Sequence, residues 1–268
     1  MVNKPLFINT RPIHRSHELN QLGDGCVQMV NLPLLAINDL SPNAQEQAML
    51  DALMNGVYQA LVVTSAEAAK RAISHLRTLG HQHADDLPKL IATPTIAVGK
   101  ATAKALYDFG LSVALPTIAN NEGMLAMPVI DKLQAGDKIL IWRGVGGRRL
   151  LHDTLAGRGV QVDAMAWYER VAPHDLAQNY HAIAPQLAYA NTHNIPIFML
   201  IASQMAFEHW QNLDSPFANN IHYLTLGVRL FDIVKSASPT TCVHLIDELS
   251  SNHLKKVIAD IHKSVLSS

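Results

Sequence analysis

Apolar and polar positions along the chain follow one strand–turn–helix plan that occurs twice. The apolar run at residues 60–65 ends in Thr-Ser, and the run at residues 198–203 ends in Ala-Ser; a helical pattern follows each. Each copy then has a second apolar strand that ends in glycine, at Gly99 or Gly227. Two copies of one plan predict two similar lobes, with a ligand-binding cleft between them.

Short continuous apolar runs alternate with helical patterns through most of the chain, which indicates an α/β fold with parallel sheets covered by helices on both faces. The predicted strands are residues 6–10, 61–64, 95–98, 112–115, 138–142, 197–201, 223–226 and 242–245. The predicted helices include residues 66–79 (closed by Gly80), 101–109, 123–133, 150–156, 204–213, 229–235 and 250–265.

The second block of this alternation lacks an opening strand like residues 138–143, and residues 6–11 near the start of the chain supply one. We therefore predict that the central block is an insertion into a discontinuous domain. The predicted domains are residues 1–36 with 169–268, and residues 37–168. The chain then crosses twice between them, through residues 27–36 and 160–170, and these segments are expected to pair as a two-stranded β linker.

Length and composition are those of a compact protein with two domains. The 268 residues are 49% hydrophobic and 16% charged, enough for two cores. A net charge of −1 argues against a nucleic-acid partner. No apolar run approaches the ~18 residues that span a bilayer, and the first residues do not resemble a signal peptide. We therefore expect a cytoplasmic protein with no membrane partner.

The residue types that bind metals do not occur in metal-binding motifs. Cys26 and Cys242 are far apart, and the 14 histidines include no His-Glu-x-x-His or Cys-paired frame. His81 and His83 are interpreted as solvated loop residues. The sequence predicts no metal and no cofactor.

The ends of the predicted strands carry groups suited to an anion. Thr10-Arg11, Thr64-Ser65, Gly99-Lys100, Arg143-Gly144 and Ser203 each follow a strand, and most of them precede a helix. Ligands bind beyond the carboxyl ends of parallel strands, where helix N-termini favour negative charge. For any one of these residues, a role as a helix cap or turn is the alternative, but recurrence at nearly every strand end favours a site.

The glycine-rich turn at residues 144–149 follows a strand but matches neither the dinucleotide nor the Walker phosphate motif. It is interpreted as a tight turn through which backbone approaches an anionic ligand. Tyr168 lies close by, at the end of an extended run that crosses between domains. It is interpreted either as an interfacial packing residue or as a proton donor, since a phenol holds its proton at neutral pH.

The order of these motifs resembles that of the uroporphyrinogen-III synthase family over residues 6 to about 255. No single motif is specific, but their order and spacing are. The motifs that match the family are Thr10-Arg11-Pro12, Val62-Val63-Thr64-Ser65-Ala66, Ala97-Val98-Gly99-Lys100-Ala101-Thr102-Ala103, Glu122-Gly123-Met124-Leu125 after Pro116, Arg143-Gly144 with the basic turn to Arg149, and Trp167-Tyr168-Glu169-Arg170.

The resemblance implies two similar flavodoxin-like parallel-sheet domains, and cyclisation of hydroxymethylbilane to uroporphyrinogen III with loss of water and inversion of ring D. It implies a monomeric lyase of haem or sirohaem biosynthesis, without a cofactor, that holds a linear tetrapyrrole in the interdomain cleft and receives it from hydroxymethylbilane synthase. Tyr168 takes the catalytic role. The substrate-binding residues implied are Arg11, Pro12, Thr64, Ser65, Ala66, Gly99, Lys100, Ala101, Thr102, Glu122, Arg143, Gly144, Arg148, Ser203, Gly227 and Arg229.

The second half departs from the family pattern, because Ala202 replaces a Thr or Phe and Gly227-Val228-Arg229 replaces Gly-x-Thr. An alternative reading is therefore a non-catalytic tetrapyrrole-binding sensor or regulatory domain of the same fold. A generic phosphosugar or nucleotide enzyme is disfavoured because phosphate motifs are missing, and an extracellular solute binder because no signal peptide is expected.

Overall fold

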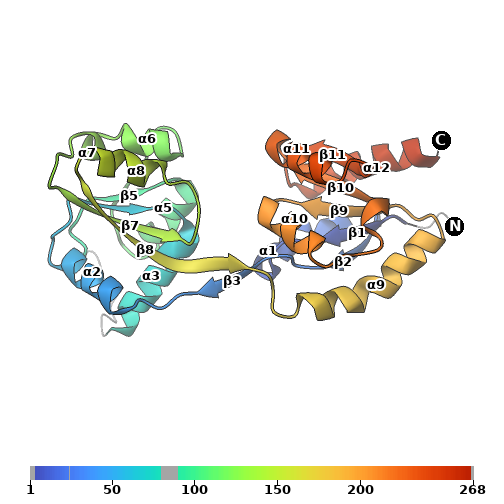
Figure 1. Cartoon of the computed structure of the whole chain (residues 1–268), viewed down its shortest axis with the longest axis horizontal. Coiled ribbons are helices and arrows are strands. Elements are labelled where there is room, and N and C mark those ends of the chain that lie inside the picture. Colours follow the sequence, from blue (N-terminus) through green and yellow to red (C-terminus); the bar gives the residue numbers. More distant parts are fainter. Residues whose placement is uncertain (1–3, 24, 80–89, 267–268) are drawn as a thin grey trace. The chain divides into compact units, whose positions relative to one another are not determined.

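The computed structural model describes residues 4–23, 25–79 and 90–266. The chain divides into two compact units: unit 1 is formed by residues 1–36 and 171–268, and unit 2 by residues 37–170 (Figure 1). The predicted inserted domain ended at residue 168, whereas unit 2 ends at residue 170. Each unit is an α/β sandwich with a parallel sheet, as the alternation of strands and helices predicted.

Unit 1 is built on a five-stranded sheet in the order β11-β10-β9-β1-β2. The strands are β1 (Leu6–Asn9), β2 (Gln28–Asn31), β9 (Ile197–Ile201), β10 (Ile221–Leu226) and β11 (Cys242–Ile246). The helices are α1 (Ile13–Ser16), η1 (His17–Gly23), α9 (Leu176–Thr192), α10 (Gln204–Gln211), η2 (Ala218–Asn220), α11 (Val228–Ala237) and α12 (Ser251–Leu266). All four neighbouring strand pairs of this sheet are parallel.

Unit 2 is built on a six-stranded sheet in the order β3-β8-β7-β4-β5-β6. The strands are β3 (Ala36–Asp39), β4 (Ala60–Val63), β5 (Thr95–Ala97), β6 (Val113–Ala114), β7 (Lys138–Gly144) and β8 (Gln161–Val171). The helices are α2 (Ala44–Met54), α3 (Ala66–Thr78), α5 (Lys100–Tyr107), α6 (Asn121–Leu125), α7 (Pro128–Asp131) and α8 (Leu150–Gly157).

The two sheets correspond strand for strand although the chain enters them at different points. The order β2-β1-β9-β10-β11 in unit 1 matches β8-β7-β4-β5-β6 in unit 2. The N-terminal strand β1 thus takes the place that β7 takes in unit 2, as the missing opening strand predicted. In chain order, unit 1 has the flavodoxin arrangement 2-1-3-4-5, and unit 2 is its circular permutation.

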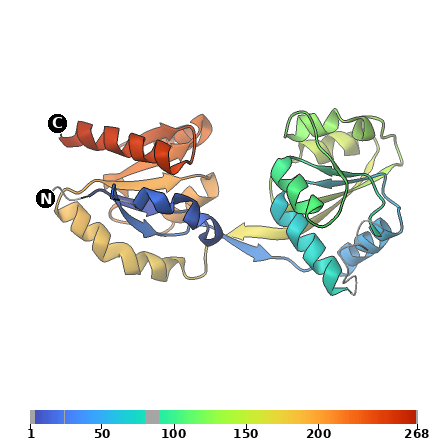
Figure 2. The ribbon, with the colours of Figure 1, turned by 180° about the vertical axis from the view of Figure 1, so that it is seen from behind.

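Helices cover both faces of each sheet. Successive residues of a strand point to opposite faces, so neighbouring residues of one strand pack against different helices. In β9, Met199 packs in the cluster that includes α9 and α10 residues, and Phe198 packs with η1 and α12 residues. In β4, Val63 packs with α2, α3 and α5, and Val62 packs with α6, α7 and α8. Both views of the ribbon show this layering within each unit (Figures 1 and 2).

Two of the predicted elements differ from the structure. The predicted crossing strand 27–36 is not one strand: Gln28–Asn31 is β2, an edge strand paired with β1, and the segment beside β8 is β3. The predicted helix 123–133 is two short helices, α6 and α7, because Pro128 begins a new helix and Met127 before it is extended. Gly80, His81 and His83 lie outside the described residues.

None of the helices within the described ranges combines the length and apolar character needed to cross a membrane.

A half-buried histidine pair links β10 and β11 in unit 1. Nδ1 of His222 lies 3.1 Å from Nε2 of His244, and the rings stack. Burial lowers the pKa of His222; burial and the neighbouring His222 lower the pKa of His244 to about 4. The folded chain therefore keeps both rings neutral at pH values where histidines of the unfolded chain are charged.

This pair should make unit 1 sensitive to acid. Unfolded histidines titrate at about pH 6.5, so between that pH and about pH 4 the unfolded chain binds more protons and the free energy of unfolding falls. From about pH 7.5 to 5, the wild type should lose roughly 1 kcal/mol more than His244→Gln, after allowance for partial exposure. Urea unfolding at the two pH values measures this. His174→Gln, with a side chain that is 97% exposed, should behave as the wild type; equal losses in all three proteins would contradict a role of the histidine pair in acid sensitivity.

Candidate functional site

A cavity of about 280 Å³ opens at the carboxyl ends of the strands of unit 2. β4 and β7 are neighbours in the sheet, yet the chain continues from β4 toward β5 and from β7 toward β8, in opposite directions. The cavity therefore lies at the topological switch point, where ligands of open α/β sheets bind. Its lining residues are Thr64, Ser65, Val98, Asn120, Asn121, Ile141, Arg143, Gly144, Val145, Gly146, Gly147, Arg148, Leu151, His152, Tyr168 and Arg170.

Ser65 joins the start of α3 to the cavity. Its Oγ accepts a hydrogen bond of 3.1 Å from the backbone N–H of Ala68, so it is the N-cap of the helix. The same Oγ accepts a 3.2 Å hydrogen bond from the hydroxyl of Tyr168. Because one oxygen serves both contacts, the position of the phenol is tied to the end of α3.

A β-bulge places the Tyr168 side chain. Arg143 pairs with Ala166 but the next residue, Gly144, pairs with Tyr168, so Trp167 is the extra residue on β8. Trp167 and Tyr168 are both buried, with 1% and 2% of their surfaces exposed, although a regular strand would point them to opposite faces. The bulge thus brings both rings to the same side of the sheet, where they pack in one core cluster, and Tyr168 also lines the cavity.

Gly144 lies directly against the Tyr168 ring. A Cβ atom at residue 144 would be 2.5 Å from Cζ of the tyrosine, well inside van der Waals contact. The backbone N–H of Val145 donates to the carbonyl oxygen of Tyr168 at 2.8 Å and holds the two strands together at this point. Glycine is therefore needed because of the close approach of the ring.

Arginines give the cavity a positive character. Arg143 turns back onto its own loop, where it donates to the carbonyl oxygens of Gly144 and Gly146. Arg148 and Arg170 form no ion pair with any carboxylate among the described residues, and both line the cavity. Two cations without a carboxylate partner, beside hydroxyl groups and the N-terminus of α3, give the cavity a positive character.

The structure brings only some of the predicted site residues into this cavity. Those that line it are Thr64, Ser65, Arg143, Gly144, Arg148 and Tyr168. Those that do not line it are Ala66, Gly99, Lys100, Ala101, Thr102 and Glu122. Thr102 is buried in the core, and Lys100 and Glu122 are exposed on helices.

Unit 1 has a separate cavity of about 350 Å³ at the carboxyl ends of β9 and β10, lined by Ser203, Gly227 and Arg229 among others. Ser203 caps α10 as Ser65 caps α3, and Arg229 lies 3.4 Å from the side-chain oxygen of Gln204. Arg11 does not line this cavity; it is 8% exposed and forms a 2.8 Å ion pair with Glu18. Pro12 precedes α1 and likewise lies outside it.

Sequence reasoning missed four polar residues of the unit 2 cavity: Asn120, Asn121, His152 and Arg170. Arg170 has the clearest sequence signal, because residues two apart on a strand share a face and it lies two residues after Tyr168. Asn120 is the N-cap of α6, a role that its residue type favours. His152 had no signal beyond its place after the basic turn. No group of three or more metal-binding side chains occurs in the described part of the chain.

The fold and this cavity define a two-domain α/β protein with an arginine-lined cavity at a sheet switch point. The family model for uroporphyrinogen-III synthase HemD matches residues 17–259. The chain therefore belongs to the uroporphyrinogen-III synthase family.

Individual relatives agree with this membership. The chain is 34% identical to uroporphyrinogen-III synthase of Escherichia coli over 139 residues, 51% of this chain and 54% of that protein. It is 37% identical to the Salmonella typhimurium uroporphyrinogen-III synthase over 86 residues, 31% of this chain and 35% of that protein. These matches thus span about half or less of the relatives' length.

Solved structures share the fold at low sequence identity. The crystal structure of a mutant uroporphyrinogen III synthase from Thermus thermophilus aligns with a TM-score of 0.61 at 16% identity, covering 97% of this chain and 99% of that one. The uroporphyrinogen-III synthetase of Helicobacter pylori aligns with a TM-score of 0.59 at 16% identity, covering 96% and 99%.

Substitution of Gly144 tests the packing of the tyrosine. Gly144→Ala should lower the free energy of unfolding by about 1–3 kcal/mol, because the new methyl group displaces the Tyr168 ring. Gly157→Ala is the matched control: it lies in α8 with no atom within 4 Å of the new Cβ, and should be neutral or stabilising by up to about 1 kcal/mol. Urea unfolding measures both, and equal effects would contradict the close approach.

Proposed function

We propose that this protein is a uroporphyrinogen-III synthase, a lyase that cyclises hydroxymethylbilane to uroporphyrinogen III with loss of water and inversion of ring D. The observation that carries the proposal is the Tyr168 hydroxyl, held at the edge of a cationic cavity in a member of this family. The substrate is a linear tetrapyrrole with acetate and propionate side chains, which complement Arg148 at the basic turn.

The first chemical step is departure of the substrate hydroxyl group. The C–O bond breaks with its electron pair on oxygen, a pyrrole nitrogen supplies electrons to the carbon, and the phenol proton of Tyr168 completes a water molecule. Ser65 orients the phenol, since its Oγ is fixed by its bond to the start of α3. A positioned general acid typically contributes about 10²–10⁴-fold to the rate.

The second step is ring closure at the substituted carbon of ring D, through a spiro intermediate. The azafulvene formed in the first step is reactive, so the protein's role is to hold the chain in the geometry that favours closure at this carbon. Arg148 and the basic turn are the groups of unit 2 that would bind the carboxylates. The bond from the spiro carbon to its original methylene bridge then breaks, and the freed methylene carbon bonds to the unsubstituted α-carbon of ring D, which inverts the ring. This α-carbon loses its proton, which restores the phenol, and no cofactor enters the reaction.

An isomer assay tests the reaction itself. The protein is mixed with freshly made hydroxymethylbilane, the products are oxidised, and uroporphyrins I and III are separated by chromatography. We expect isomer III in excess of the isomer I that forms spontaneously. Only isomer I from folded protein would overturn the proposal, and tetrapyrrole binding without turnover would support the sensor alternative.

Tyr168→Phe tests the proton donor. It should lower kcat for isomer III formation by about 10²–10⁴-fold with little change in KM, because the phenylalanine fills the same space without a proton to give. Tyr107→Phe is the control, since this exposed tyrosine on α5 donates to the carbonyl oxygen of Val113 outside the cavity. It should keep wild-type kcat. A loss of less than tenfold for Tyr168→Phe would remove the phenol from the mechanism.

A further inference from the structure

Two arginine side chains flank the Tyr168 ring. Cζ of Arg71 is 5.6 Å from the ring centroid, and Cζ of Arg170 is 5.5 Å from it. Guanidinium groups at this distance are attracted to the electron-rich face of an aromatic ring. Gly144 contacts the same ring, so the phenol is confined by groups from α3, β7 and β8.

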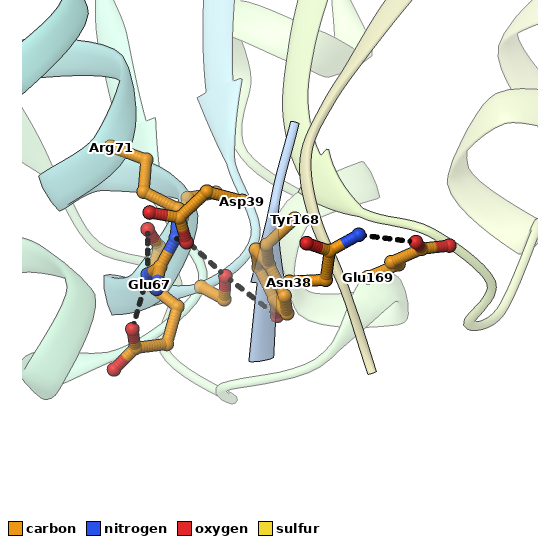
Figure 3. Close-up of polar contacts among 8 residues, drawn as sticks. Asn38, Asp39, Glu67, Arg71, Tyr168 and Glu169 are labelled. Atoms are coloured by element: carbon orange, nitrogen blue, oxygen red, sulfur yellow. Dashed lines mark hydrogen bonds and ion pairs between the residues drawn. The ribbon is translucent and has the colours of Figure 1, made fainter. Parts of the chain in front are cut away.

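The charge of Arg71 is already satisfied. Its Nε lies 2.6 Å from Oδ1 of Asp39 on β3, and its Nη1 forms an ion pair with Glu67 one turn earlier on α3 (Figure 3). Beside it, Asn38 of β3 donates a 2.7 Å hydrogen bond to Glu169 of β8. These contacts connect β3 with α3 and β8, and we assign Arg71 to holding the elements around Tyr168 in place.

Arg170 differs in its surroundings. No carboxylate in the described parts of the chain lies within ion-pair distance of its guanidinium, and its side chain is exposed at the cavity. Its polar contact is with the tyrosine: Nη2 donates to the hydroxyl oxygen of Tyr168 at 3.3 Å. The unpaired cation is therefore directed at the phenol oxygen.

We infer that Arg170 is a positioning residue that acts through Tyr168, by holding the phenol and stabilising the phenolate that forms when the phenol gives up its proton. The inference rests on the function proposed above. When the proton passes to the departing hydroxyl oxygen, the C–O bond breaks and negative charge remains on the tyrosine oxygen. The N–H of Arg170 already points at this oxygen, so the hydrogen bond becomes an ion pair with the phenolate without rearrangement.

Ser65 completes the arrangement. In the resting state its Oγ accepts a hydrogen bond from the phenol, and a hydroxyl group can act both as donor and as acceptor. After proton transfer, the Ser65 hydroxyl can turn and donate to the phenolate while its lone pair still accepts from Ala68. The tyrosine oxygen then has two donors, one of them cationic. Ring closure later releases a proton that returns the tyrosine to its neutral form.

A double-mutant cycle distinguishes action through Tyr168 from a direct contact between Arg170 and the substrate. Arg170→Gln should lower kcat about tenfold or more with KM changed less than about twofold. In the Tyr168→Phe background the same substitution should change kcat less than about twofold, because there is no phenolate to stabilise. Arg170→Lys keeps the charge and should recover part of the loss.

The control is Arg158→Gln, which removes an arginine at the end of α8 outside the cavity and should leave kcat and KM unchanged. Three results would overturn the inference: an equal loss of kcat in both backgrounds, a loss confined to KM, or no loss. A KM effect would instead indicate that Arg170 binds a substrate carboxylate.

A measurement without substrate separates this inference from the proposed function. The ¹³Cζ resonance of Tyr168, identified by its absence from Tyr168→Phe, should shift in Arg170→Gln and stay unchanged in Arg158→Gln. An unchanged resonance in Arg170→Gln would overturn the contact whatever the activity. If the wild type makes no isomer III but the resonance still shifts in Arg170→Gln, the proposed function would be contradicted and the arginine–tyrosine contact would stand.

Discussion

The site of unit 2 depends on the close approach of Gly144 to the ring of Tyr168. The register shift between β7 and β8 brings these two residues opposite each other, and the lack of a side chain at Gly144 leaves room for the ring. The ring position in turn brings the hydroxyl to Ser65 and to Arg170. Ser65, the N-cap of α3, and Arg170 of β8 therefore both contact the Tyr168 hydroxyl, because Gly144 lets the ring approach β7 closely at the bulge.

The two units share a plan but not a chemistry. Ser203 caps α10 with the same geometry that Ser65 has at α3, so the helix-capping half of the plan is present twice. At the end of β1 in unit 1, however, the chain that follows β2 contributes Leu34, whose N–H donates to the carbonyl oxygen of Thr10. Leu34 is a buried aliphatic residue, and among the described residues no hydroxyl group from this segment contacts Ser203.

Much of the architecture was predictable from the sequence because it depends on local signals. Apolar runs that end in Thr-Ser before small helix formers predicted β4 and α3, and the unmatched strand near the start of the chain predicted its place in unit 1. The predicted crossing strand was wrong because an extended pattern does not indicate its partner. Residues 28–31 satisfy their backbone groups with β1, and the chain crosses later, at β3.

Side-chain direction was the less predictable part of the site. Arg143 lines the cavity, but its guanidinium bonds its own turn, and Arg11 pairs with Glu18. An arginine has several rotatable bonds, so which acceptor it meets depends on tertiary contacts. Arg170 belongs to a matched motif but was not predicted as a site residue. Its role depends on the lack of a carboxylate near its guanidinium among the described residues, and a sequence pattern does not show which groups are far away in space.

The permuted relation of the two sheets has a consequence for how the chain folds during synthesis. Unit 2 is one continuous segment, so all of its strands are available once residue 170 has been made. β1 must wait for β9: the Thr10 hydroxyl donates to the carbonyl oxygen of Leu200, 190 residues later. Until then the apolar residues Phe7 and Ile8 lack one of their two neighbouring strands. Unit 2 can therefore fold first. Pairing β1 with β9 then closes a very long loop at a cost in chain entropy, and the folded unit 2 within that loop shortens it.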